Sequence, residues 1–191
     1  SLIYRDLPFV LMPSIWKRIS QFSVKRKESE ERPHGDGIMV GFDSPEAFEE
    51  IFWKTFCAEN YIFDDHLEPH IVNSEVTNKF KKFVMQVLAS GENPKQGRYL
   101  SKNNNNILRL KTIKKAFPNA IIIIPFRNPI QQAISLFQQH IKFVEMNLTE
   151  PFIGQYMSWL GHFEFGPVHR PYWFGKERAY LNAKIGKNDF N

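Results

Sequence analysis

The sequence predicts an α/β domain in which helices flank a parallel β-sheet. The run Ala120–Phe126 is apolar throughout and rich in isoleucine, as a strand buried on both faces of a parallel sheet should be. Upstream, Arg98–Ser101 is a short strand candidate, and a helical pattern between the two completes a βαβ unit. The 191 residues suit a single domain, with this βαβ core at about residues 97–148.

The composition excludes several classes of protein. With 42% hydrophobic and 24% charged residues, the chain is typical of a globular domain and not of a disordered or fibrous protein. A single cysteine excludes an internal disulfide and a cysteine-rich zinc site. No apolar run approaches the roughly 20 residues of a membrane span. No signal peptide is visible at residues 1–6, so we expect a cytoplasmic protein.

The positive charge is concentrated in the second half of the chain. Residues 1–95 hold 12 Lys and Arg against 15 Asp and Glu, whereas residues 96–191 hold 13 against 5, which together give the net charge of +5. This distribution favours an anionic partner: a phosphorylated cofactor, an acidic surface or a nucleic acid. Nucleic acid is the least favoured of these, because the basic residues are dispersed and match no nucleic-acid-binding motif.

Helix signals account for much of the remaining chain. Ser44-Pro45-Glu46 predicts a helix start, with a hydroxyl cap and a proline at the first helical position, and apolar residues follow at helical spacing. Four further helices are expected: near Thr77–Ala89, after a cap at Asn105 or Asn106, from Pro129 to about Leu148, and over Glu150–Phe163. The tail from Gly166 is expected to be loop-like.

Arg127 and Ser135 point to a phosphate site. Arg127 stands where the predicted strand ends and the helix of Pro129 begins, and ligands of open α/β sheets bind at the carboxyl ends of the strands. A helix N-terminus attracts phosphate through its free N–H groups and its dipole. Ser135 lies two turns inside the helix, so the two side chains can close on one phosphate from two sides.

This segment resembles the 3′-phosphate-binding segment of sulfotransferases that use 3′-phosphoadenosine 5′-phosphosulfate (PAPS). The resemblance is carried by Phe117-Pro118-Asn119-Ala120, by Ile121–Ile124, by Arg127-Asn128-Pro129 and by Ser135 eight residues past the arginine. It implies a P-loop NTPase-like fold, PAPS as the donor and adenosine 3′,5′-bisphosphate as the product. It also implies that Arg127 and Ser135 hold the 3′-phosphate.

The same resemblance implies roles for three other cations. The family places a lysine at the end of the preceding strand, and Lys102, twenty-five residues before Arg127, matches it. Its implied role is to stabilise charge on the transferring sulfuryl group, as fixed positive charge does in phosphoryl transfer. A basic, glycine-containing segment near the C-terminus closes over the cofactor in this family, which makes Lys176 and Arg178 candidates for cofactor binding.

The sequence departs from the family pattern in two places. We find no 5′-phosphosulfate loop, which is a strand followed by a motif such as [PR]-[KR]-S-G-[ST]-[ST], so we expect a fragment that lacks its first strand and loop. The sheet edge left by that strand needs other protection, for which a homodimer is a candidate. In addition, Asn104 replaces the catalytic histidine that cytosolic members carry two residues after the lysine, and an asparagine cannot take a proton.

Another base is then needed to deprotonate an acceptor hydroxyl. His34 is the first candidate, although it also fits a turn histidine in a polar loop. Asp36 either orients His34 or is itself the base, and Glu31 is an outside choice. The run Asp64–His70 holds metal-ligand residue types, but Pro69 disrupts the helical spacing that a zincin site needs, so we expect no metal site.

Two functions from different classes follow. The first is a PAPS-dependent sulfotransferase that acts on a hydroxyl or amine of a small-molecule or carbohydrate acceptor. Its specificity would come from loops such as Lys25–Gly37 and Asp64–Ser74. The second is a catalytically inactive relative that binds a nucleotide or acts through protein contacts. Nucleotide affinity without turnover would favour the second.

Overall fold

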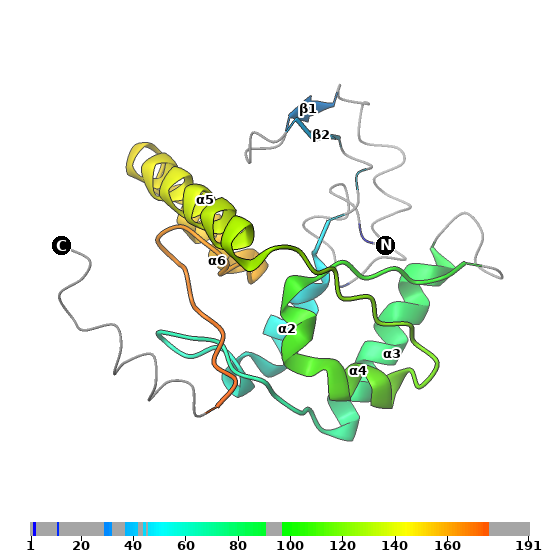
Figure 1. Ribbon diagram of the computed structural model, residues 1–191. Helices are drawn as coiled ribbons and strands as arrows, with labels where there is room; N and C mark the ends of the chain where they lie inside the picture. The colour runs from blue at the N-terminus through cyan, green and yellow to red at the C-terminus, as the bar shows by residue number, and fades with distance from the viewer. Residues whose placement is uncertain are drawn as a thin grey trace.

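The structure, a computed structural model, is predominantly helical in the part of the chain that it describes (Figure 1). That part consists of Leu2, Leu11, residues 29–31, residues 37–41, Ser44, residues 46–90 and residues 97–175. Its elements in chain order are β1 (Glu30–Glu31), β2 (Met39–Val40), α2 (Glu49–Cys57), η2 (Ala58–Asn60), α3 (Ser74–Ala89), η3 (Asn104–Arg109), α4 (Leu110–Ala116), α5 (Pro129–Thr149) and α6 (Phe152–Leu160).

The first predicted helix corresponds to α2, but its start lies further along the chain. The helix begins at Glu49, and Ser44 does not cap it: the Ser44 hydroxyl accepts a hydrogen bond from the Gly41 N–H at 2.9 Å. Two acidic residues, Glu49 and Glu50, occupy the first turn, where they interact favourably with the helix dipole. The apolar face predicted for this helix is buried at Phe52, and Trp53 is buried beside it.

Helix α3 confirms the second predicted helix and extends it by one turn at the N-terminus. Asn73 caps it, since its side-chain oxygen accepts a hydrogen bond from the Val76 N–H at 2.9 Å. The helix ends at Ala89, as the sequence predicted. Its buried face packs on α2 through aromatic rings: the Trp53 and Phe80 rings lie 4.4 Å apart between centroids, and the Phe52 and Phe83 rings 5.2 Å. This cluster is the centre of the core.

The later helices also follow the sequence, with two differences. The cap ahead of the third helix is Asn103, not Asn105 or Asn106, and it introduces the 3₁₀ helix η3 before α4 begins. Helix α5 ends at Thr149, close to the predicted end. Helix α6 is shorter than the predicted range and ends at Leu160. Gly161 follows it as the C-cap, with a φ of +78° in the left-handed conformation that glycine adopts freely.

The structure does not show the two predicted strands of the βαβ unit. Neither Arg98–Ser101 nor Ala120–Phe126 forms a strand, and the second run is exposed instead of buried: Ile121, Ile123 and Phe126 keep 81%, 84% and 88% of their surface accessible. The reason is physical. A strand needs a neighbouring strand for its backbone groups, and within the described residues the only paired strands are β1 and β2, which form an antiparallel ribbon. A parallel sheet therefore stays a prediction.

The helices form a connected body (Figure 1). Helix α3 contacts both α2 and α4, and α6 contacts both α2 and α5. Helix α5 extends away from this group. In its C-terminal half, Phe143 packs against Phe165, with ring centroids 4.8 Å apart. None of the helices in the described ranges combines the length and the apolar character that crossing a membrane requires.

Candidate functional site

Lys102 lies in a short segment immediately before η3. Its side chain is exposed, and it lies beside Glu46, Ala47 and Glu49 at the start of α2. Tyr99 lies at the same place, and its hydroxyl donates a 2.7 Å hydrogen bond to the Glu49 carboxylate. The other Glu49 oxygen accepts a hydrogen bond from the Trp53 indole N–H at 3.0 Å. Both oxygens of Glu49 are therefore engaged by neutral donors.

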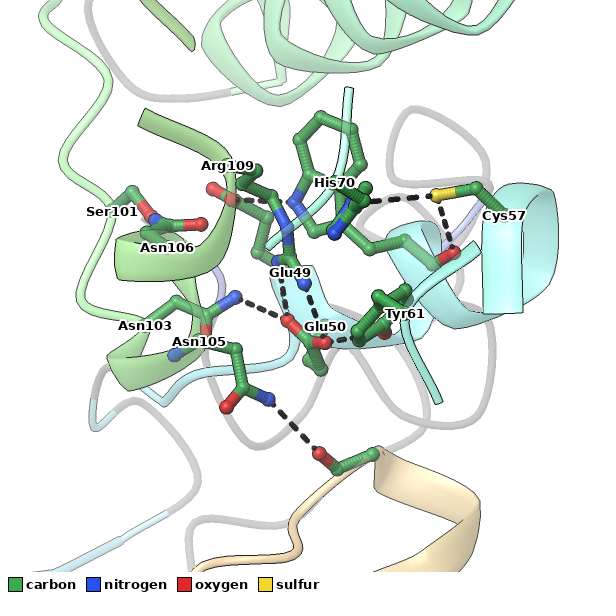
Figure 2. A network of polar contacts seen from close by, with 12 residues as sticks. Glu49, Glu50, Cys57, Tyr61, His70, Ser101, Asn103, Asn105, Asn106 and Arg109 are labelled. Atoms are coloured by element: carbon green, nitrogen blue, oxygen red, sulfur yellow. Dashed lines mark hydrogen bonds and ion pairs between the residues drawn. The ribbon is translucent and has the colours of Figure 1, made fainter. Parts of the chain in front are cut away.

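The residues on either side of Lys102 are held by hydrogen bonds (Figure 2). The Ser101 hydroxyl oxygen accepts a bond from the Asn106 side-chain amide at 2.9 Å. On the other side, Asn103 uses both ends of its amide: its oxygen accepts from the Asn105 N–H at 3.0 Å, and its nitrogen donates to Glu50 at 2.7 Å. Residues 101–103, called the Lys102 segment from here on, are thereby hydrogen-bonded to helix α2.

Glu50 is the centre of a buried polar network. Arg109 donates two bonds to its carboxylate, at 2.6 and 2.9 Å, and Tyr61 donates a third. Glu50 and Arg109 are each only 1% exposed. Burial alone would raise the pKa of Glu50, but the charge of Arg109 and the hydrogen bonds from Arg109, Tyr61 and Asn103 hold it below its usual value. The Arg109 guanidinium also lies over the rings of Trp53 and Tyr61, 4.8 and 4.9 Å from their centroids.

Asn105 connects this network to the C-terminal part of the described chain. Its side-chain nitrogen donates to the Gly161 carbonyl at 3.2 Å, and its oxygen accepts from the Tyr172 hydroxyl at 2.8 Å. Asn105 itself is 1% exposed. One short asparagine run therefore joins the Lys102 segment, α2, the end of α6 and the chain near Tyr172.

Arg127 lies just before α5, and Ser135 lies in the second turn of that helix. Arg127 is exposed, and its Nε donates to the Gln132 side-chain oxygen. The free N–H groups that the sequence predicted for this helix end are not free: Asn128 accepts from the N–H groups of Ile130 and Gln131 at 2.9 and 3.2 Å. Ser135 is half-buried, seven residues past the cap. Seven residues are almost two helical turns, so Ser135 shares a face with Asn128, about 10 Å along the axis.

The structure leaves several predicted site residues without a test. His34, Asp36, Lys176 and Arg178 lie outside the described residues. Glu31, the outside choice for a base, is exposed and accepts a hydrogen bond from the Gly37 N–H at 2.7 Å. The residues grouped around Lys102 at the start of α2 do not include Arg127 or Ser135.

The histidine-rich run holds a stacked imidazole. His66 faces Asp65 through Nδ1 and Glu68 through Nε2, at 2.5 and 2.9 Å, and its ring stacks between those of Phe63 and Trp173. A group of three or more residues able to hold a metal ion is not found within the described ranges. The cluster instead joins residues 63–68 to the chain at Trp173, whose N–H donates to the Leu67 carbonyl at 2.8 Å.

Sequence reasoning missed Glu50 and Arg109. A signal for each was present: Glu50 occupies a position of the first predicted helix beside the apolar Ile51 and Phe52, and Arg109 lies between Leu108 and Leu110. A charged residue in such surroundings is buried only when it is paired. Their separation by 59 positions gave no reason to pair them with each other.

A comparison with protein families covers Lys102, Arg127, Ser135 and the buried network around Glu50. The family model described as the sulfotransferase family matches residues 44–170, well over half of the chain. The chain belongs to the sulfotransferase family. Neither a search of curated proteins nor a search of solved structures returned a match.

Membership of the sulfotransferase family confirms the resemblance found in the sequence and implies a P-loop-like α/β fold and sulfuryl transfer. The matched range includes Lys102, Arg127 and Ser135. His34 precedes it and Lys176 follows it, so the family match does not extend to either.

Proposed function

We propose that this sulfotransferase-family chain transfers a sulfuryl group from PAPS to a hydroxyl or amine of a small-molecule or carbohydrate acceptor. The observation that supports this most is the family match, which spans the segment carrying Lys102, Arg127 and Ser135. Arg127 and Ser135 hold the 3′-phosphate, and Lys102 stabilises charge at the transferring group.

The start of α5 suits a phosphate through its side chains. An arginine has five N–H donors, and the Nε of Arg127 is engaged by Gln132. The Nη groups extend from an exposed side chain. The Ser135 hydroxyl lies two turns along the same helix. Because Asn128 already caps the helix, a phosphate here depends on Arg127 and Ser135 more than on backbone N–H groups.

Lys102 supplies a positive charge for the transfer step. The acceptor oxygen attacks sulfur, the bond from sulfur to the bridging oxygen breaks, and its electron pair stays on the phosphate of adenosine 3′,5′-bisphosphate. The acceptor's proton passes to a base, for which we propose His34 or Asp36. An ammonium group beside the bridging oxygen stabilises the charge that develops on it.

A second candidate function is an inactive relative that binds a nucleotide. It is favoured by Asn104, which stands where cytosolic members of the family carry a catalytic histidine.

Calorimetric titration with adenosine 3′,5′-bisphosphate tests the phosphate site. We expect Arg127→Ala to weaken binding tenfold or more, which is about 1.4 kcal/mol. Arg98→Ala is the matched control, because Arg98 is another exposed arginine of the basic half and should leave the affinity unchanged. Equal affinity of the parent chain and Arg127→Ala would contradict the assigned site.

Turnover separates the two candidate functions. The chain is incubated with PAPS and a panel of hydroxyl and amine acceptors, and the adenosine 3′,5′-bisphosphate formed is measured. Acceptor-dependent product that Lys102→Ala reduces supports the transferase. Binding of the nucleotide without any turnover supports the inactive relative.

A further inference from the structure

We propose that Glu50, acting through Asn103, is a positioning residue for Lys102. This inference rests on the proposed function, because Lys102 acts on a sulfuryl group only if the chain binds PAPS. It goes beyond that function by assigning a role to a buried ion pair that no part of the phosphate site contacts.

The tether between α2 and the Lys102 segment is short and direct. The Asn103 side-chain nitrogen donates to Glu50 Oε2 at 2.7 Å, and Asn103 is bonded covalently to Lys102. The same side chain caps η3 by accepting from the Asn105 N–H. These two hydrogen bonds fix the orientation of the planar Asn103 side-chain amide. Because Asn103 follows Lys102 directly, they also restrain the backbone at Lys102.

The anchor of that tether is rigid. Glu50 holds Asn103 with a carboxylate that also accepts two bonds from Arg109 and one from Tyr61. Glu50 and Arg109 are almost completely buried, so moving either would expose an unpaired charge to an apolar core. A side chain that cannot move gives Asn103 a fixed point of attachment.

The network also leaves the Lys102 ammonium without a carboxylate partner on α2. The acidic residues in the first turn of α2 are Glu49 and Glu50, and both are engaged elsewhere. Glu49 accepts from the Trp53 indole and the Tyr99 hydroxyl, and Glu50 is paired with Arg109. Lys102 remains exposed beside them. A lysine that is held in place and not paired can meet an anionic group without first breaking an ion pair.

Two variants separate the tether from the cap. Asn103→Ser keeps a good N-cap, because a serine hydroxyl can accept from the Asn105 N–H, but it is too short to reach Glu50. Asn104→Ser is the matched control, since Asn104 is the next residue along and is exposed. Thermal unfolding of each variant shows whether the fold is kept.

Nitrogen-15 relaxation measures the tether without any ligand. We expect the Lys102 amide to be rigid in the parent chain and in Asn104→Ser, with an order parameter near 0.85, and flexible in Asn103→Ser, with a value below about 0.6. An unchanged order parameter in Asn103→Ser overturns the proposal.

Turnover measures whether the tether acts through Lys102. We expect Asn103→Ser to lower kcat tenfold or more while KM for PAPS changes less than twofold, and Lys102→Ala to lower kcat at least as much. The variant that carries both substitutions should have a kcat no lower than that of Lys102→Ala alone, because Asn103 has no lysine left to position. Additive losses overturn the proposal. A parent chain without nucleotide binding or turnover refutes the proposed function instead, and the order parameter still decides whether Glu50 holds Lys102.

Discussion

Arg109 of η3 and Glu50 of α2 form a two-point ion pair in the core, with N–O distances of 2.6 and 2.9 Å. Each charge is paired with the other, and burial removes both from solvent. The pair joins segments that lie 59 positions apart, and Asn103 attaches the Lys102 segment to it. Packing and the candidate site therefore depend on the same carboxylate.

Removing one partner of this pair should be strongly destabilising. We expect Arg109→Met to lower the free energy of unfolding by about 3–5 kcal/mol, because Glu50 is left buried without its counter-charge. Urea denaturation measures the loss. Lys79→Met is the control: Lys79 is 2.8 Å from Glu75 in an exposed pair, and its loss should cost less than about 0.5 kcal/mol. A loss below about 1 kcal/mol in Arg109→Met would contradict the role given to the pair.

Gly161 is a second point at which the fold depends on Glu50. A Cβ at this position would lie 2.6 Å from Glu50 Cγ, and the φ of +78° adds backbone strain to that contact. We expect Gly161→Ala to lower the free energy of unfolding more than Gly37→Ala does. Gly37 has a similar φ of +75°, but no atom lies within 4 Å of its Cβ position. Strain alone accounts for about 1–2 kcal/mol in both. Chemical denaturation compares the two variants, and equal losses would mean that Glu50 moves aside freely.

Local patterns in the sequence predicted the helices well. The apolar spacing over Thr77–Ala89 lies within one helix, so the sequence alone identifies α3 and its end. The same holds for Pro129, which begins α5. The Arg127 and Ser135 pattern is also local, and the family match includes both residues.

Features that depend on distant residues were not predictable in the same way. A run such as Ala120–Phe126 has strand composition, but a strand forms only beside a partner, and the sequence does not show whether one is present. The predicted cap, Asn105 or Asn106, lies two or three residues after the observed cap, Asn103, because the asparagines of this run are equally suitable by type. The contact with Glu50 distinguishes Asn103 from its neighbours, and that contact is tertiary.

The exposed isoleucine run gives a direct test of the predicted strand. Ile123 is 84% exposed, so we expect Ile123→Ser to change the free energy of unfolding by no more than about 0.5 kcal/mol. Val87→Ser is the comparison, because Val87 lies on α3 and is only 3% exposed. This substitution should lower the free energy of unfolding by about 2 kcal/mol or more. A loss of that size in Ile123→Ser, measured by urea denaturation, would show that the run is buried in a sheet, as its composition predicts.

His70 should make stability depend on pH. Burial, helped by the charge of Arg109, lowers the pKa of His70 from 6.5 to about 4, while its ring stacks on Tyr61 with centroids 4.5 Å apart. The unfolded chain therefore binds the proton more readily between these two values. The contribution of His70 to stability is complete above pH 6.5 and is lost as the pH falls towards 4, by up to about 1.4 kcal/mol per pH unit. His70→Phe keeps a stacking ring and should remove this part of the slope.

His162 provides the opposite sign in the same experiment. Burial opposes its charge, but Glu164, 3.6 Å from Nδ1, outweighs burial and raises the pKa of His162 above 6.5. Its contribution to stability is present below pH 6.5 and is lost as the pH rises through the folded-state pKa. Unfolding free energies from pH 4 to 8 should therefore rise more steeply with pH in His162→Gln than in the parent, and less steeply in His70→Phe. Parallel curves for the parent chain and His70→Phe would mean that His70 has the same pKa in the folded and unfolded chain, which contradicts its lowered folded-state pKa.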